Sequence, residues 1–229
     1  VKDALGLEID KFELGGAAVH ARGSGVIDNA AGSEAEMFDL MRRFLSYLPS
    51  DRRRLPPKQG EPLAPSRDPE KLLDVFPPGG RRPYDVHHVV ESIVDGGTFF
   101  EIAPQFGAAI CAGLARIDGF PVGVLASNPR HRAAAIDGPA ADKQVRFVEI
   151  CDTFHAPIVY LADVPGFMIG PEAERTGVLR RGMRAIQAIR RATVPVYTVQ
   201  MRRSFGLAAA ATGNTDGRSL RLAWPTGVW

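Results

Sequence analysis

The stretch Pro195-Val-Tyr-Thr-Val-Gln-Met-Arg-Arg-Ser-Phe-Gly-Leu-Ala-Ala-Ala-Ala-Thr-Gly213 decides the fold. Its first half has the β-branched and apolar residues of a buried strand, Gly206 marks a sharp turn, and the alanines predict a short helix. A strand that turns directly into a helix leaves free backbone N–H groups at the helix start, where they can hold a negative charge. The simpler alternative is that Gly206 is only a turn and that Ala208 to Ala211 are only a tightly packed helix.

A second stretch of this kind is Ile158-Val-Tyr-Leu-Ala-Asp-Val-Pro-Gly-Phe167, a buried strand that ends in a rigid turn. We expect the rest of the chain to hold these two strand ends together. Asp163 lies at the strand end, where catalytic acids occur. The alternative for Asp163 is that it caps the following turn through Val164 and Gly166.

The composition excludes several classes of protein. The chain has 229 residues, of which 45% are hydrophobic, enough for one large domain or for one domain with an attached piece. A net charge of +2 demands neither nucleic acid nor an anionic membrane surface. No run approaches the roughly 18 apolar residues of a membrane span and no signal peptide is visible, so we expect a cytoplasmic protein.

The two cysteines and the two ends of the chain add two expectations. Cys111 and Cys151 lie in apolar segments without metal-type spacing, which favours buried, reduced thiols in a cytosolic-type compartment. The sequence starts at Val1 without Met and stops at Trp229 just after a strand-like run. We therefore expect it to be part of a longer gene product.

The first 83 residues divide into a helix-containing piece and a linker. Residues 14–28 are glycine-rich and predict a loop followed by a short strand. A helix over 33–48 begins with the capping box of Ser33 and Glu36 and ends at Pro49. Residues 49–83 hold nine prolines, which predict an extended linker on the surface, with a short helix at 69–75. We place a domain boundary in this linker.

Residues 84–229 predict an α/β domain. Strands at 111–117 and 121–126 form a hairpin through Asp118-Gly119. Continuously apolar strands that alternate with helices indicate a sheet buried on both faces. The remaining predicted elements are strands at 98–102, 157–162, 194–201 and 219–224, and helices at 85–95, 140–154, 177–192 and 206–212.

No side-chain catalyst is evident. The sequence has no Gly-x-Ser-x-Gly elbow, His-Glu-x-x-His motif or Walker loop. His87 and His88 are adjacent on a predicted helix and point in different directions, so they are poor joint ligands, and we expect no metal site. What remains is backbone chemistry, because glycines and small residues at strand ends can stabilise a developing oxyanion with N–H donors.

Several motifs resemble the carboxyltransferase (β) subunit of biotin-dependent acyl-CoA carboxylases of the propionyl-, acetyl- and methylcrotonyl-CoA type. They occur in one order: Pro83-Tyr-Asp-Val, Asp95-Gly-Gly-Thr-Phe-Phe-Glu-Ile, Asp137 with Ala140-Ala-Asp-Lys143, Cys151-Asp-Thr-Phe, Ala162-Asp-Val-Pro-Gly-Phe-Met-Ile-Gly170 and Ala223-Trp-Pro-Thr226. The resemblance implies an α/β, crotonase-like fold of stacked ββα units. It further implies that residues 1–48 are the end of the N-terminal half, 49–83 a Pro-rich linker, and 84–229 an incomplete C-terminal, carboxybiotin-side half.

The resemblance also implies a mechanism and partners. Carboxybiotin on a carrier protein loses CO2, a backbone N–H pair in the C-terminal half holds the biotin oxyanion, and biotin takes the α-proton of the acyl-CoA. A second backbone pair, in the N-terminal half of a neighbouring subunit, holds the thioester enolate. The implied partners are a biotin carboxylase or biotin carboxyl carrier subunit and further β subunits, in a hexamer built from dimers.

On this resemblance the first pair falls on Leu207 and Ala208, just after Gly206. The implied walls of the carboxybiotin site are Asp163, Val164, Pro165, Gly166, Phe167, Phe205 and Ala210. Many family members have a second glycine where this chain has Leu207, but a backbone N–H donor tolerates Leu. The arginines between 180 and 203 have two interpretations, either contact with carboxybiotin or CoA, or a solvated face with subunit contacts.

Two rival functions remain open on the sequence. One is a biotin-dependent acyl-CoA decarboxylase subunit of the same fold, which runs the transfer backwards. The other is a non-catalytic assembly partner. The acyl group of the substrate is not predicted.

Overall fold

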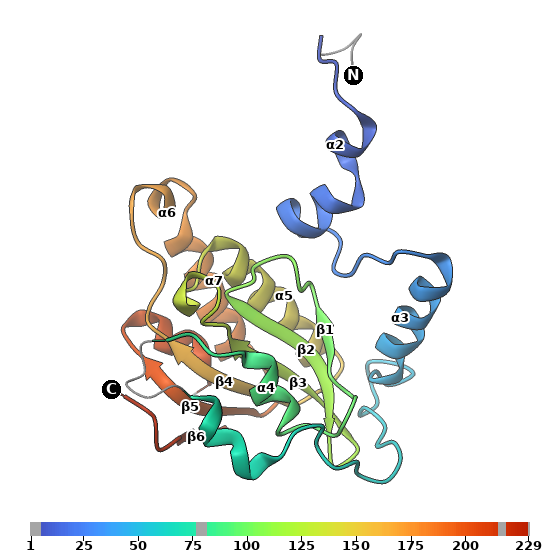
Figure 1. Cartoon of the computed structure of the whole chain (residues 1–229), viewed down its shortest axis with the longest axis vertical. Coiled ribbons are helices and arrows are strands. Elements are labelled where there is room, and N and C mark those ends of the chain that lie inside the picture. The colour runs from blue at the N-terminus through green and yellow to red at the C-terminus, as the bar shows by residue number, and fades with distance from the viewer. Residues whose placement is uncertain (1–5, 77–81, 215–218, 229) are drawn as a thin grey trace.

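A mixed, six-stranded sheet forms the centre of the molecule in the computed structural model, which describes residues 6–76, 82–214 and 219–228 (Figure 1). The strands lie in chain order across the sheet. They are β1 (Phe100–Ile102), β2 (Ile110–Ile117), β3 (Phe120–Ser127), β4 (Ile158–Val164), β5 (Val196–Ser204) and β6 (Leu220–Ala223).

The sheet changes direction at β3. Strands β1, β2 and β3 pair antiparallel, and the predicted hairpin is confirmed, with Ile117 opposite Phe120 around Asp118 and Gly119. Both turn residues have positive φ, 52° and 76°, as a tight hairpin turn requires. Strands β3 to β6 pair in parallel. The carboxyl ends of β4 and β5 therefore meet at one edge of the sheet.

Helices cover both faces of the sheet, as predicted. Helices α5 (Gly138–Thr153) and α7 (Val178–Arg191) lie behind the sheet in Figure 1, and α4 (Val86–Glu91) lies in front of it. The short 3-10 helix η4 (Leu207–Thr212) packs on α7, and a second 3-10 helix, η2 (Pro69–Val75), contacts α4. Two separate apolar cores result, one on each face. Strand β6 is exposed along its whole length.

Residues 6–46 run beside the sheet rather than within it. They contain α2 (Lys11–Gly15), a π-helix η1 (Val19–Ser24) and α3 (Glu34–Ser46) (Figure 1). The strand expected within 14–28 is wrong, since η1 occupies that place and Gly25 ends it with a φ of 67°. One hydrogen bond of the capping box is confirmed, since the Ser33 hydroxyl accepts from the Glu36 N–H at 3.2 Å. The Glu36 carboxylate accepts from the Gly32 N–H at 2.7 Å.

Most predicted boundaries are accurate to a few residues. Helix α4 ends at Glu91, four residues before its predicted end, and β1 begins two residues after its predicted start. The sequence did not predict α6 (Pro171–Arg175) or the 3-10 turn η3 (Arg132–Ala134), both too short to show helical periodicity.

The division into 1–48, 49–83 and 84–229 remains a prediction. Residues 1–5, 77–81, 215–218 and 229 of those ranges lie outside the described part of the chain. Within the linker, Gln59 donates its backbone N–H to the Gly119 carbonyl at 3.1 Å, so this segment lies along the β2–β3 hairpin. Among the described residues, no helix is long and apolar enough to cross a membrane.

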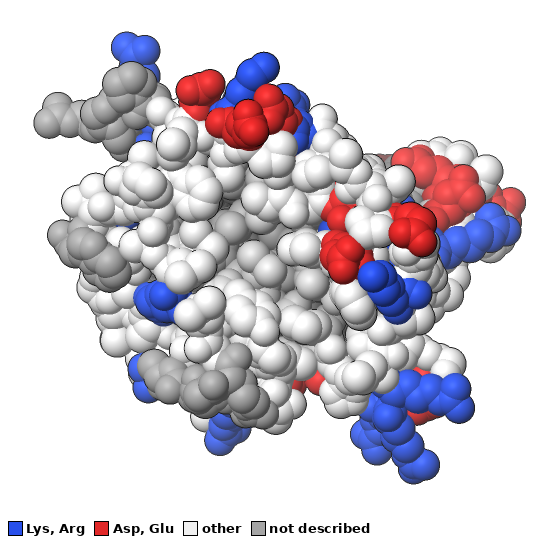
Figure 2. Space-filling view, turned by 90° about the horizontal axis from the view of Figure 1, so that it is seen from below, with Lys and Arg blue, Asp and Glu red and all other residues white. Residues whose placement is uncertain are grey.

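One face of the molecule is largely uncharged. Figure 2 shows this face from below, with a hollowed middle of uncharged side chains and with Lys, Arg, Asp and Glu gathered toward its margins. The described part of the chain also leaves many large apolar side chains more than 40% exposed, among them Met41, Leu45, Leu220 and Leu222.

The seating of α5 on the sheet depends on Gly123 of β3. A Cβ added at Gly123 would overlap the sulfur of Cys151 and lie 3.2 Å from the Phe147 ring, both on α5. Cys151 and Phe147 are buried, so neither can move into solvent. Helix and strand therefore approach each other more closely than any side chain at position 123 allows.

We predict that Gly123→Ala lowers the free energy of unfolding by about 1–3 kcal/mol, the usual effect of overpacking a core. Chemical denaturation measures this change. The double variant with Cys151→Ala should recover part of the loss, because the sulfur that the new methyl group meets is gone. Additive effects of the two substitutions would contradict the close contact.

Candidate functional site

The carboxyl ends of β4 and β5 form a joined pair of turns. Val164 pairs with Ser204, and the Phe205 N–H donates to the Val164 carbonyl at 3.0 Å. Gly206 follows with φ 60° and ψ −157°, a combination essentially restricted to glycine. A Cβ on Gly206 would meet no atom within 4 Å, so the backbone conformation alone selects glycine here. The stretches 158–167 and 195–213 therefore lie side by side.

Helix η4 starts directly after this turn. The predicted short helix is confirmed as a 3-10 helix, and the Ala209 N–H donates to the Gly206 carbonyl at 3.2 Å. Leu207 and Ala208 come first in the helix, so their N–H groups have no acceptor within it. The Ala208 side chain is buried in the core, whereas Leu207 is 52% exposed. Buried alanines thus anchor a helix start whose backbone donors are held in fixed positions.

The turn after β4 is held by residues ahead of α5 and by α7. The Gly166 carbonyl accepts from the Ile136 N–H at 3.0 Å, and the Met168 N–H donates to the Ile136 carbonyl at 2.9 Å. The Phe167 ring packs so closely on Gly182 of α7 that a Cβ there would lie 2.6 Å from it. Pro165, Gly166 and Phe167 are half-buried, and so are Phe205 and Ala210.

Asp163 is fully buried and bound on all sides. Its Oδ2 accepts from Arg202 Nη2 at 2.7 Å and from the Tyr84 hydroxyl at 3.2 Å. Its Oδ1 accepts from the Nε and the backbone N–H of Arg203, at 2.8 and 3.1 Å. Asp163 therefore joins the end of β4 to the end of β5, and its carboxylate has no free face toward a ligand. This is neither of the two roles the sequence left open for it.

The charge on Asp163 is held by its two arginines. Burial alone would raise the pKa of this carboxyl, but the hydrogen bonds and charges of Arg203 and Arg202 outweigh burial and lower the pKa. Burial and the nearby Asp163 charge raise the pKa of Tyr84, which keeps its hydroxyl protonated as a donor. The Tyr84 ring also lies 4.7 Å below the Arg202 guanidinium.

Sequence reasoning missed the roles of Tyr84, Arg202 and Arg203. Arg202 was a candidate for contact with carboxybiotin or CoA, yet its side chain is only 5% exposed and bound to Asp163. A carboxylate inside an otherwise apolar strand was the available signal, because a buried charge needs a paired cation. On α7, Arg181 forms an ion pair with Asp142 of α5 at 3.2 Å, and Arg180, Arg184, Arg190 and Arg191 are exposed.

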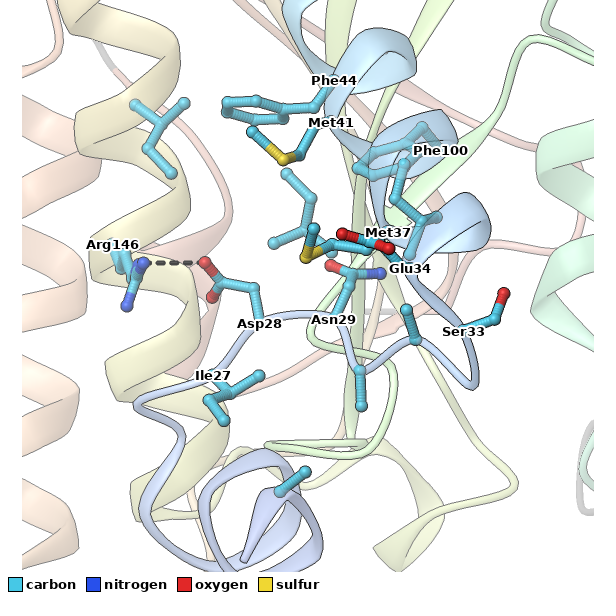
Figure 3. Close-up of a pocket in the computed structure, with 16 residues that line it drawn as sticks. Ile27, Asp28, Asn29, Ser33, Glu34, Met37, Met41, Phe44, Phe100 and Arg146 are labelled. Atoms are coloured by element: carbon cyan, nitrogen blue, oxygen red, sulfur yellow. Dashed lines mark hydrogen bonds and ion pairs between the residues drawn. The ribbon is translucent and has the colours of Figure 1, made fainter.

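An apolar pocket lies between α3 and the sheet domain, away from the two strand-end turns. Its volume is about 890 Å³, and Figure 3 shows Met37, Met41 and Phe44 of α3 beside Phe100 of β1 in its lining. An ion pair of 2.7 Å between Asp28 and Arg146 marks one side. No residue of the two strand-end turns lines this pocket. The sequence predicted the helix α3 but not the pocket.

We predict that Asp163→Asn destabilises the protein by about 3–5 kcal/mol, because it leaves two partly or fully buried guanidinium groups without their anion. Since folding lowers the pKa of Asp163, this stabilisation is present above about pH 4 and is lost as the pH falls through the folded value. Urea titration measures both. Asp39→Asn is the control, since it removes an exposed pair with Arg42 and should cost less than about 1 kcal/mol. Equal effects of the two substitutions would contradict the account.

Comparison with known proteins agrees with the strand–helix architecture. The transcarboxylase 12S core, solved with methylmalonyl-coenzyme A and methylmalonic acid bound, superposes with a TM-score of 0.93 at 33% identity. The superposition covers 99% of this chain and 44% of that one. The expected α/β, crotonase-like fold of stacked ββα units is confirmed.

Curated relatives give the same result. The propionyl-CoA carboxylase carboxyltransferase subunit of Haloferax mediterranei is 37% identical over 99% of this chain and 44% of its own length. The methylmalonyl-CoA decarboxylase subunit alpha of Veillonella parvula is 36% identical over 99% of this chain and 45% of its own length. The chain thus spans less than half the length of these relatives. Since the family model for the carboxyl transferase domain matches residues 1–227, the chain belongs to the carboxyl transferase family.

Proposed function

We propose that the protein transfers a carboxyl group from carboxybiotin on a carrier protein to the α-carbon of an acyl-CoA, and that the joined ends of β4 and β5 receive the biotin. One observation carries the proposal: a strand-end turn presents two backbone N–H groups at a helix start that the buried Ala208 anchors. Such a site suits a reaction whose reactive groups come from the substrates.

The backbone donors of Leu207 and Ala208 supply the electrostatic part of the reaction. Carboxybiotin, when bound, would bring both the carboxyl group and a ring nitrogen that becomes basic once CO2 leaves. The two N–H groups would donate to the ring oxygen that gains negative charge. Since Ala208 is buried and Gly206 fixes the turn, the donors need no rearrangement as the charge develops.

The walls of this edge fit a small, planar ring system. Phe167 and Phe205 are half-buried aromatic side chains on the two turns, and Ala210 leaves space beside the helix. The Ser204 hydroxyl is buried without a hydrogen-bond partner among the described residues, one position before Phe205. We therefore assign Gly206, Leu207 and Ala208 to the oxyanion site. Pro165, Gly166, Phe167, Phe205 and Ala210 form its walls, and Asp163 and Val164 position the turns.

We expect the acyl-CoA to be bound in part by residues that this chain does not contain. The chain covers 44% of the length of the transcarboxylase core that was solved with methylmalonyl-coenzyme A. We infer that the thioester and its enolate are held by the remaining half and by a neighbouring subunit. The uncharged face in Figure 2 fits such assembly. A biotin carboxylase or biotin carrier subunit is the proposed partner, with the cytoplasm as the proposed location.

A decarboxylase is the second candidate, on one specific observation. The similarity to the methylmalonyl-CoA decarboxylase subunit of Veillonella parvula, at 36% identity, is nearly as high as that to the propionyl-CoA carboxylase subunit. Both reactions need the same oxyanion site, because one is the other in reverse. Physical pairing with a membrane sodium pump would favour the decarboxylase. A purely structural role would leave both reactions absent.

The deciding assay incubates the intact protein with a carboxybiotinylated carrier and a panel of acyl-CoA thioesters, and follows the carboxylated product. We expect transfer to at least one thioester. Absence of product with every thioester, in a folded protein, would reject the proposal. Transfer in reverse, from a carboxylated acyl-CoA to the biotin carrier, is compatible with either reaction, so pairing with a membrane sodium pump is the observation that favours the decarboxylase.

We predict that Ala208→Pro lowers turnover by roughly 10² or more, the usual effect of losing one oxyanion donor, because proline has no N–H. Proline is tolerated in the first turn of a helix, and circular dichroism checks that the variant is folded. Leu207→Ala is the matched control, since it keeps the N–H and should change turnover only slightly. Normal turnover of a folded Ala208→Pro variant would show that the donor pair lies elsewhere.

A further inference from the structure

Three potential metal ligands from three separate elements meet on the α4 side of the sheet. His87 lies on α4, Glu101 on β1 and Cys111 on β2. Their ligand atoms lie within 4.8 Å of one another, and among the described residues no other group of three such side chains is this close. The cluster is not visible in the sequence, because Glu101 lies 14 positions after His87 and Cys111 lies 10 positions after Glu101.

The spacing of the ligand atoms fits a tetrahedral ion. His87 Nε2 lies 2.8 Å from Glu101 Oε2, and Cys111 Sγ lies 3.3 Å from Glu101 Oε1 and 3.8 Å from His87 Nε2. Bonds of zinc to nitrogen, oxygen and sulfur place neighbouring ligand atoms roughly 3.3–3.6 Å apart at a tetrahedral centre. Shifts of about half an ångström would therefore complete the site, and solvent could supply the fourth ligand as water.

The imidazole of His87 is already oriented for this role. Asp85 Oδ1 lies 3.2 Å from His87 Nδ1 and also accepts from the His87 backbone N–H at 3.0 Å. A carboxylate on the second ring nitrogen is the usual support of a metal-bound histidine, since it fixes the ring and makes the other nitrogen a better ligand. The other oxygen of Asp85 is held by Arg130 at 2.8 Å.

Access and charge also allow a divalent cation. The His87 side chain is 39% exposed and that of Glu101 is 23% exposed, so an ion can enter beside them. Cys111 is buried, which shields a metal–thiolate bond from oxidation. Asp85, Glu101 and a Cys111 thiolate carry three negative charges near the cationic Lys143 and Arg130. Lys143 is itself turned away to donate to the Ile110 carbonyl at 2.8 Å.

We propose that His87 Nε2, a Glu101 carboxylate oxygen and Cys111 Sγ bind one zinc ion, with Asp85 as the support of His87. The mix of thiolate, imidazole and carboxylate suits zinc better than magnesium or calcium, which prefer oxygen ligands alone. Binding releases the thiol proton, and the imidazole proton where His87 is charged, to solvent. The ion joins α4 to β1 and β2, on the opposite face of the sheet from η4.

Equilibrium dialysis of the intact protein against zinc, followed by metal analysis, tests the proposal. We expect one zinc per chain, and binding at least about 100-fold weaker in His87→Gln, Glu101→Gln and Cys111→Ser. Asp85→Asn should weaken binding by about 10–100-fold, the usual effect of losing a supporting carboxylate. Cobalt in place of zinc should show a sulfur-to-metal absorption band that Cys111→Ser abolishes.

The matched controls are the neighbouring histidine and the other buried cysteine. His88→Gln and Cys151→Ala should each retain one zinc per chain with unchanged affinity. His87 is half-exposed, so His87→Gln should fold even if a core variant does not, and circular dichroism checks each variant. Failure of the unaltered protein to bind zinc, or equal affinity in His87→Gln, would overturn the proposal.

Discussion

The carboxylate of Asp163 is the constraint on which the rest of the structure depends. A fully buried anion at the end of β4 is unstable unless cations and donors surround it. Arg202 and Arg203 of β5 and Tyr84 supply them, at distances of 2.7 to 3.2 Å. Because these partners come from the neighbouring strand and from the segment ahead of α4, one charge fixes the relation of three parts of the chain. The turns after β4 and β5 begin directly after these paired residues.

The backbone connects the buried charge of Asp163 to the proposed site. The Phe205 N–H bonds to Val164, Gly206 turns the chain through a conformation that other residues avoid, and the buried Ala208 anchors the start of η4. Each step is a rigid connection, so the N–H donors of Leu207 and Ala208 keep their direction. Preorganised donors of this kind are what stabilisation of a developing anion requires. The buried ion pairs therefore act on the site by positioning, without touching a ligand.

Much of this could be predicted from the sequence, for identifiable reasons. Capping residues such as Ser33 and turn residues such as Asp118-Gly119 act locally, so their effects are visible in the chain. Continuous apolar strands indicated a sheet covered on both faces, and Gly206 marked the sharp turn. The binding of Asp163 by Arg202, Arg203 and Tyr84 could not be predicted, because it depends on which strands are neighbours. The same holds for the cluster of His87, Glu101 and Cys111. The strand expected within 14–28 failed because glycines that suggested loops lie around a π-helix instead.

The central claim is that the joined ends of β4 and β5 receive biotin through the N–H groups of Leu207 and Ala208. Titration of the isotope-labelled protein with biotin, followed by amide NMR, tests it most directly. The account predicts downfield shifts of these two amide protons, together with smaller changes at Phe167 and Phe205. Saturable shifts confined to the pocket beside α3, for example at Met37 and Phe44, with no change at Leu207 and Ala208, would contradict it.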